Sequence, residues 1–424
     1  MKVRSGFAGW LLMLWLLPVS WVVAAERSAP NFLLVIADDL GVDVLGSYGH
    51  ASKAPKTPHL DQLAAVGLSF DHFWVTPACT TTRGALISGQ HGFESGIDFV
   101  PAVMPDATAT LQQRLKQPDI EQPYATGVFG KWHLGGGRPD TNHPARFGID
   151  SYAGNLFNLD NYTDWTLTVN GRQQPETAYH TSKVTDLAID FIAQHQGKPW
   201  FAWVAYSAPH KPFHQPPAEL ISSSKKMRRP AEKYRAMVEA MDTEIGRLLA
   251  SLSEQERANT LVVFIGDNGT PKVARERSLF AKDHVKGTLY EGGIRAPLIV
   301  AGAGVSRKGQ REQAMVNAAD IFATFTEAAT GVTNASGIPD NSYSFLPLLR
   351  GEKSAVRTFN YSEWRKRNES LSWTLRDDSY KLIRHADGRT ELFAVDDLSE
   401  TDPLEKPEVE SELMKLSEQL RQTQ

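Results

Sequence analysis

The chain has 424 residues, of which 45 are Lys or Arg and 49 are Asp or Glu, so its formal net charge at pH 7 is −4. That balance argues against a nucleic-acid-binding protein, which would carry a strongly basic surface. The length and the ordinary globular composition predict one large domain with a smaller one, and the single cysteine excludes an intramolecular disulfide.

Residues 1–25 have the pattern of a secretory signal peptide. Lys2 and Arg4 give a basic start, residues 6–23 are almost wholly apolar, and Ala24-Ala25 offers a cleavage site. The alternative is a membrane anchor, because the apolar run approaches the length that spans a bilayer. We favour cleavage because the small-residue site is well placed. The mature protein is then expected to be exported, periplasmic or secreted, without stable membrane insertion.

Patterns of buried strands recur along the chain that follows. Uninterrupted apolar runs occupy residues 31–37, 125–129, 200–205, 261–265 and 297–300. Runs of this length are typical of strands buried on both faces of a parallel sheet. Helical patterns, such as those of residues 57–67 and 234–252, lie between the runs. This alternation predicts an α/β fold for residues 26–350, with a large, mainly parallel sheet flanked by helices.

The tail, residues 351–424, has a different pattern. Three short strand patterns, 373–376, 380–383 and 390–393, are separated by turn signals. A final helical pattern places Val409, Leu413, Leu416 and Leu420 on one face. We predict a small C-terminal subdomain, an antiparallel sheet with a terminal helix, whose role is packing.

Chemically capable side chains follow four of the five apolar runs: Asp38 and Asp39, Lys131 and His133, His210, and Asp267 and Asn268. Ligands in open α/β sheets gather at the carboxyl ends of the strands, so we expect these residues to lie together. The Asp and Asn residues among them offer only oxygen ligands, which favours Ca²⁺ or Mg²⁺ over Zn²⁺. Residues 267–269 alone are better interpreted as a turn. Together, the two pairs predict a metal site at Asp38, Asp39, Asp267 and Asn268.

Cys79 stands at the start of Cys79-Thr80-Thr81-Thr82-Arg83. Threonines are good N-cap residues, so we expect them to open a helix over residues 83–88. Cys79 would then lie near a helix N-terminus, where free amides and the helix dipole favour an anion. Arg83, four residues on, would lie on the same helical face. Cys79 is thus an inert buried thiol, a reactive thiol, or the precursor of a modified side chain.

Four further residues complete the candidate site. In an extended segment Lys131 and His133, two residues apart, would point to one side. His210 lies between prolines and alone reads as a turn histidine, while Lys286 alone reads as a loop residue. Combined with Arg83 and the metal site, these residues predict a pocket for a tetrahedral anion with an activated nucleophile.

From about Asn31 to the tail, the sequence resembles the sulfatase family, within the alkaline phosphatase-like fold. The resemblance is carried by five motifs in the order of the family, residues 35–39, 79–89, 130–135, 266–269 and 286–295. It implies an arylsulfatase-like sulfuric ester hydrolase acting on a sulfated carbohydrate or an aryl sulfate.

The resemblance also implies roles for individual residues. A formylglycine-generating maturation enzyme would convert Cys79 to Cα-formylglycine before folding, and a hydroxyl of the hydrated aldehyde, activated by Ca²⁺, would attack sulfur. The residues that match the metal ligands are Asp38, Asp39, Cys79, Asp267 and Asn268. Arg83 and Lys131 match the groups that hold the diol, His133 matches the base, and His210 and Lys286 match the groups that bind sulfate and assist the leaving oxygen.

One position departs from the family pattern. The maturation signal usually has proline two residues after the cysteine, with alanine accepted, whereas this chain has Thr81. We expect modification of Cys79, with lower efficiency or by a tolerant maturation enzyme. The alternatives are a formylglycine-dependent phosphonate monoester or phosphodiester hydrolase and, from another class, a non-catalytic exported binding protein.

Overall fold

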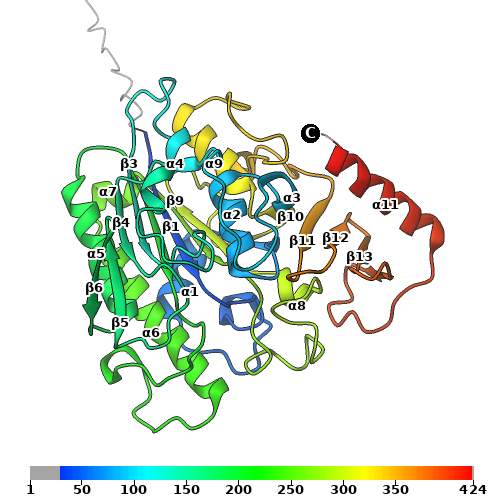
Figure 1. Ribbon diagram of the computed structural model, residues 1–424, viewed down its shortest axis with the longest axis horizontal. Coiled ribbons are helices and arrows are strands. Elements are labelled where there is room, and N and C mark those ends of the chain that lie inside the picture. Colours follow the sequence, from blue (N-terminus) through cyan, green and yellow to red (C-terminus); the bar gives the residue numbers. More distant parts are fainter. Residues whose placement is uncertain (1–28, 423–424) are drawn as a thin grey trace, which may run out of the picture.

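The computed structural model describes residues 29–422, so the predicted signal peptide lies outside the described residues. Within this range, ten strands form one sheet in the order β10-β2-β9-β8-β1-β7-β3-β4-β5-β6 (Figure 1). These strands are β1 (Asn31–Ala37), β2 (Leu68–Trp74), β3 (Ala125–Gly130), β4 (Ser151–Gly154), β5 (Trp165–Val169), β6 (Arg172–Glu176), β7 (Trp200–Tyr206), β8 (Thr260–Gly266), β9 (Leu298–Gly302) and β10 (Gln310–Asn317).

Helices cover both faces of this sheet. The α-helices are α1 (Pro58–Val66), α2 (Cys79–Ser88), α3 (Gly92–Ser95), α4 (Leu111–Arg114), α5 (His180–Gln194), α6 (Pro230–Ala250), α7 (Glu254–Ala258), α8 (Glu291–Ile294), α9 (Asp320–Thr330), α10 (Leu346–Arg350) and α11 (Pro407–Gln422). Short 3₁₀ helices occupy η1 (Gly46–Tyr48), η2 (Pro144–Phe147) and η3 (Ala218–Leu220).

The centre of the large sheet is parallel. β1 pairs in parallel with β8 and β7, and β7 is parallel to β3. β9 runs antiparallel between β8 and β2, so the apolar run of residues 297–300 forms an antiparallel strand within a mixed sheet. The predicted α/β fold with a large, mainly parallel sheet is confirmed.

Alternate residues of β1 enter two separate cores, one on each face of the sheet. Phe32 and Leu34 belong to the cluster that also includes residues of α2 and α9. Leu33 and Val35 belong to the cluster shared with α1, α5 and α6. All four side chains are at most 1% exposed. This burial on both faces explains why the strand is an uninterrupted apolar run.

The second sheet follows at the C-terminal end of the chain. It is antiparallel, in the order β11-β12-β13-β14, with bounds β11 (Asn360–Trp364), β12 (Ser372–Arg376), β13 (Tyr380–Arg384) and β14 (Thr390–Ala394). The sequence predicts the last three strands but not β11. Leu413 and Leu420 of α11 are buried in the core of this sheet, and Val409 and Leu416 pack against it. The predicted antiparallel sheet with a terminal helix is therefore confirmed (Figure 1).

Candidate active site

The carboxyl ends of the four central strands form one edge of the candidate active site. Ala37 at the end of β1 is in register with Gly266 of β8 and with Tyr206 of β7. Residues that directly follow these strands, such as Asp38 and Asp267, are therefore delivered to the same place. Two groups of side-chain contacts meet there and are joined by the N–H of Asp39, which donates to Oδ1 of Asp267 at 3.1 Å. Together they contain the ten predicted site residues: Asp38, Asp39, Cys79, Arg83, Lys131, His133, His210, Asp267, Asn268 and Lys286.

Cys79 is the first residue of α2, and its side chain is buried. Its Sγ lies 3.1 Å from Nδ1 of His133 and 3.3 Å from Nζ of Lys131. Burial raises the pKa of the thiol, although Lys131 opposes this shift, so the cysteine is neutral at neutral pH. A neutral, buried thiol is a poor nucleophile. As an unmodified cysteine, this residue is therefore badly suited to attack a substrate.

Helix α2 begins earlier than the sequence predicts. The three threonines after Cys79 are expected to cap a helix that starts at Arg83, but the helix already includes Cys79 and its N-cap is Ala78. The hydroxyl of Thr81 donates to the carbonyl of Ala78 at 2.9 Å, so it ties the first turn to the preceding residue. Cys79 thus lies within the first turn, where backbone amides lack helical partners and favour an anion.

Two fully buried cations are each neutralised by a buried carboxylate. Arg83 donates from Nε and Nη2 to Oδ2 of Asp267, at 3.1 and 2.8 Å, and Nζ of Lys131 is paired with Asp38. Burial alone would raise the pKa of Asp38, but Lys131, then His210 and Arg83, hold it well below its usual range. Burial, and then the charge of Asp38, raise the pKa of Asp267 to about 6.

The oxygen-bearing residues form a candidate metal centre. One ligand atom each of Asp38, Asp267 and Cys79 lies within 4.8 Å of the others. Nδ2 of Asn268 donates to Oδ1 of Asp39 at 2.9 Å. Oδ1 of Asp38 and Oδ1 of Asn268 are buried and have no hydrogen-bond partner among the described residues. Buried oxygens without partners are costly unless a cation binds them, and carboxylate and amide oxygens suit calcium. The donor set therefore fits a hard cation.

His133 reaches Cys79 through an unusual backbone conformation. β3 ends at Gly130, and His133 has a φ of 58°, in the left-handed region. The segment is therefore not simply extended, as the i, i+2 argument assumes, although Lys131 and His133 both contact Cys79. Burial, followed by Lys131 and Arg83, lowers the pKa of His133 well below its usual value. The imidazole is neutral at neutral pH and can accept a proton.

His210 and Lys286 lie on the Asp39 side of the site. Nε2 of His210 is 4.0 Å from Oδ2 of Asp39, and Nζ of Lys286 is ion-paired with Asp39. Nδ1 of His210 is 2.7 Å from the carbonyl oxygen of Lys211, and this nitrogen carries the proton because a carbonyl only accepts. Burial lowers the pKa of His210, although Asp39 opposes the shift. In the neutral ring, Nε2 is therefore the unprotonated nitrogen near Asp39.

Thr80 is a site residue that the sequence reasoning misses. Its Oγ1 lies 3.2 Å from Nδ1 of His133, the same nitrogen that contacts Cys79. The one sequence feature that could have indicated Thr80 is its position next to Cys79. From the sequence, Thr80 is instead interpreted as a helix N-cap residue.

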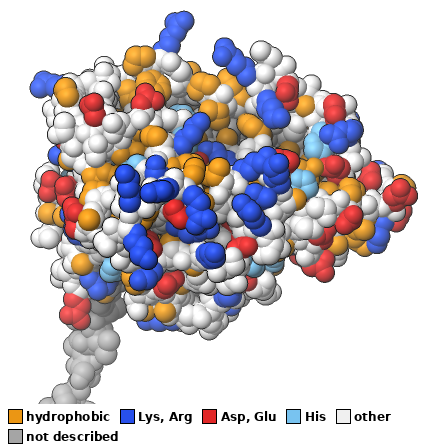
Figure 2. Space-filling model, turned by 90° about the horizontal axis from the view of Figure 1, so that it is seen from below, with side chains coloured by type: hydrophobic (Ala, Val, Ile, Leu, Met, Phe, Trp, Pro, Cys, Tyr) orange, Lys and Arg blue, Asp and Glu red, His pale blue; other side chains and the backbone are white. Residues whose placement is uncertain are grey.

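Charge is distributed unevenly over the surface. Figure 2 shows many Lys and Arg side chains gathered on one face, although the net charge of the chain is −4. An anionic ligand that approaches this face meets a favourable electrostatic field.

Comparison with known families agrees with this geometry. The sulfatase family model matches residues 30–332, and the model of the N-sulphoglucosamine sulphohydrolase C-terminal region matches residues 278–424. The first match covers well over half of the chain, so the protein belongs to the sulfatase family.

Curated relatives are similar over most of this chain. Arylsulfatase J of Mus musculus is 30% identical over 72% of this chain and 54% of its own length. N-acetylgalactosamine-6-sulfatase of Canis lupus familiaris is 28% identical over 83% of this chain and 72% of its own length. The chain therefore spans little more than half of the length of arylsulfatase J.

Solved structures share the fold. Ps i-CgsB in complex with k-i-k-neocarrahexaose superposes with a TM-score of 0.81 at 26% identity, covering 93% of both chains. BT4656 in complex with its substrate D-glucosamine-2-N,6-O-disulfate gives a TM-score of 0.75 at 20% identity, covering 93% of this chain and 98% of that one, which shows the fold alone.

Among the helices of residues 29–422, none has both the length and the apolar character to cross a membrane.

Proposed function

We propose that this protein hydrolyses a sulfate monoester of a carbohydrate or an aryl alcohol, with residue 79 as the reacting position. The observation that carries the proposal is the placement of Cys79 in the first turn of α2, in contact with His133 and Lys131. A thiol that is neutral and buried makes little use of such neighbours. A side chain derived from it that carries hydroxyl groups would use both.

Two groups would complete the site. A calcium ion bound by Asp38, Asp39, Asp267, Asn268 and the modified residue 79 would stabilise negative charge and lower the pKa of a neighbouring hydroxyl. Conversion of Cys79 to formylglycine by a maturation enzyme would supply the hydrated aldehyde as the source of the nucleophile. The unpartnered Oδ1 atoms of Asp38 and Asn268 support the first group, and the raised pKa of the thiol supports the second.

The residues of the chain then have separate tasks. Arg83 and Lys131 hold the carboxylates of Asp267 and Asp38, and Lys131 also holds the group at position 79. His133, neutral and 3.1 Å from that position, is placed to accept a proton there.

Lys286 and His210 act on the substrate side. Charge builds on the leaving oxygen as the ester bond breaks, and a preorganised cation stabilises that charge. Lys286 provides the cation, and His210, once Nε2 is protonated beside the bound anion, donates from Nε2 to a sulfate oxygen. Both lie beside Asp39, whereas His133 contacts Cys79.

The test compares wild type with Cys79→Ala on 4-nitrophenyl sulfate, a panel of sulfated saccharides and bis(4-nitrophenyl) phosphate. Wild type should release sulfate, and Cys79→Ala should lose this activity by roughly 10³-fold or more, as removal of a nucleophile does. The thermal unfolding midpoint of the variant serves as the folding control. Phosphodiester hydrolysis without sulfate release would favour the alternative hydrolase, and no hydrolysis of any ester would contradict the proposal.

We extend the proposal to the substrate, the compartment and the domains. A sulfated glycan is the favoured substrate because the names of the relatives include N-acetylgalactosamine-6-sulfatase and a neighbouring structure binds neocarrahexaose. Export after cleavage behind Ala25 predicts a mature N-terminus at Glu26, which N-terminal sequencing would detect. The division into a catalytic domain, 26–350, and a C-terminal subdomain, 351–424, places the boundary before β11.

A further inference from the structure

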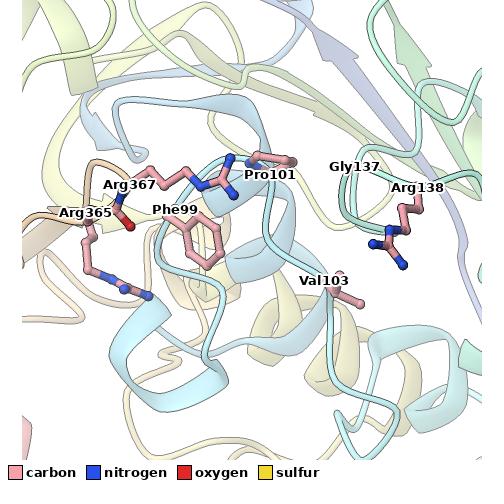
Figure 3. A pocket seen from close by; sticks show the side chains of 9 residues that line it. Phe99, Pro101, Val103, Gly137, Arg138, Arg365 and Arg367 are labelled. Carbon is pink, nitrogen blue, oxygen red and sulfur yellow. The ribbon is translucent and has the colours of Figure 1, made fainter.

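A cavity of about 550 Å³ lies outside the set of ten site residues (Figure 3). It is lined by Phe99, Pro101, Val103, Gly135, Gly137, Arg138, Arg365, Arg367 and Asn368. Gly135 is only two residues beyond His133, a separation that the backbone spans in about 7 Å. The cavity therefore begins close to the residue that contacts Cys79.

The end of β11 contacts the loop that carries Lys286, and the segment after β11 borders the cavity. A Cβ atom placed on Gly287 would lie 3.6 Å from the indole ring of Trp364, so this ring packs beside the residue after Lys286. Nε1 of Trp364 is buried and has no hydrogen-bond partner among residues 29–422. The chain then continues into Arg365 and Arg367. The cavity wall is thus connected through Gly135 to His133 and through Trp364 to the residue after Lys286.

Arg365 is fixed by two contacts to the opposite wall. It donates from Nε and Nη2 to the carboxylate of Asp98 at 2.8 and 2.7 Å, and its guanidinium lies 4.9 Å from the ring centre of Phe99. Its charge is therefore offset by Asp98. These contacts attach the segment after β11 to the loop of residues 98–103.

Arg138 and Arg367 differ from Arg365 because neither has an ion pair or a hydrogen bond with any described residue. Arg367 belongs to a turn in which the N–H of Glu369 donates to the carbonyl of Lys366 at 3.0 Å. Figure 3 shows Arg367 reaching toward Pro101, with Arg138 on the other side of the cavity. The lining contains no carboxylate, so the cavity holds two positive charges that no acidic residue offsets.

We infer that this cavity binds a second anionic group, a sulfate or a carboxylate, on the saccharide whose sulfate ester occupies the active site. The inference rests on the proposed function. A guanidinium binds either oxyanion through two parallel hydrogen bonds. Phe99, Pro101 and the exposed Val103 offer an apolar wall for a sugar ring. The substrate class that fits both regions is a saccharide with at least two negative groups, rather than a simple aryl sulfate.

The test is calorimetric titration of Cys79→Ala, which does not turn the ligand over. The probes are three chondroitin disaccharides: one with a single sulfate and a methyl-esterified carboxylate, one with the same sulfate and a free carboxylate, and one with a second sulfate and the esterified carboxylate. At least one doubly charged disaccharide should bind about 10-fold more tightly than the singly charged one, as one charge-assisted contact allows. The affinities of the disaccharide with the free carboxylate and of the one with the second sulfate show which oxyanion the cavity prefers.

The same titrations are repeated on a variant that combines Cys79→Ala with Arg138→Gln and Arg367→Gln. In this variant the preference for a doubly charged disaccharide should fall to less than about 2-fold, a loss of the size expected when an exposed charged contact is removed. Arg172→Gln, at an exposed arginine of the edge strand β6, is the matched control and should keep the preference. Equal affinity for all three disaccharides, no binding of any, or an unchanged preference after both arginine substitutions would overturn the inference. Sulfate release from 4-nitrophenyl sulfate by wild type reports separately on the proposed function, because that substrate has one charge.

Discussion

The Sγ of Cys79 lies 3.1 Å from Nδ1 of His133, between the first turn of α2 and the segment that follows β3. Burial keeps the thiol and the imidazole neutral, because it raises the pKa of the first and lowers that of the second. A neutral base beside a buried position is suited to remove a proton from a group that stands there. The contact therefore supports a reacting group at position 79 that has a hydroxyl to lose.

Replacement of Arg83 by methionine tests the buried ion pairs behind the site. Asp267 would lose both hydrogen bonds from the guanidinium and remain buried. Removing one partner of a buried pair costs about 3–5 kcal/mol, so the free energy of unfolding should fall by that amount. Urea unfolding measures it, with the exposed Arg229→Met as the control. Similar midpoints for the two variants would show that Asp267 does not need Arg83.

Calcium should stabilise the protein against heat. The unpartnered Oδ1 atoms of Asp38 and Asn268 gain a ligand in the folded state only. A ligand present at 100 times its Kd adds about 2.7 kcal/mol of stability, so the unfolding midpoint should rise with Ca²⁺ and fall with a chelator. Asn268→Leu should reduce this increment. The prediction fails if scanning calorimetry gives the same midpoint with calcium and with chelator.

Glu363 of β11 should make stability depend on pH. Burial raises its pKa from 4.5 to about 7, although Tyr361 and the N–H of Phe93 donate hydrogen bonds that oppose the shift. Between pH 4.5 and 7 the folded state binds more protons at this group than the unfolded state, so its contribution to stability is lost as pH rises through this window.

A glutamine at position 363 cannot ionise, so Glu363→Gln should remove this loss of stability with rising pH. Relative to wild type, its free energy of unfolding should increase by about 3 kcal/mol between pH 4.5 and pH 7.5, from about 1.4 kcal/mol per pKa unit. Urea unfolding at several pH values measures the difference. A difference that stays constant across this range would show that Glu363 is ionised in the folded protein.

Lys381 of β13 should be essential for the attachment of the C-terminal sheet. Its Nζ lies 3.1 Å from Glu291 of α8 and 2.6 Å from Glu400, and 5.1 Å from the ring centre of Trp74. Lys381→Met leaves two buried carboxylates without their cation, so we expect a loss of about 3–5 kcal/mol in urea unfolding. Arg389→Met, at an exposed ion pair, is the matched control. Equal midpoints for the two variants would contradict a structural role for Lys381.

The sequence predicts the centre of the fold better than its edges. Strands such as β1 and β8 are buried on both faces, so they appear as uninterrupted apolar runs. β2 was not predicted because it contains Asp71, which is paired with Arg311 of the neighbouring β10. That pairing joins distant parts of the chain, and no local pattern reveals it.

The candidate site shows the same division. Asp38 and Asp267 directly follow core strands, so the topology alone places them together. Taken alone, His210 and Lys286 are interpreted as turn and loop residues, because their contacts with Asp39 depend on tertiary packing. Only their combination with the other candidate residues, and then the family resemblance, indicates that they belong to the site. Arg367 was not predicted because its position depends on how the segment after β11 packs against residues 98–103.

Mass spectrometry of the peptide that contains Cys79 shows whether residue 79 is formylglycine, if the protein is purified from its native host and treated with a thiol-alkylating reagent. We expect a peptide in the aldehyde form that reacts with a hydrazide probe and resists alkylation. A mixture of converted and unconverted peptide would agree with the lower efficiency of maturation that we expect from Thr81. A free, fully alkylated thiol at position 79 in all of the protein would contradict the formylglycine mechanism.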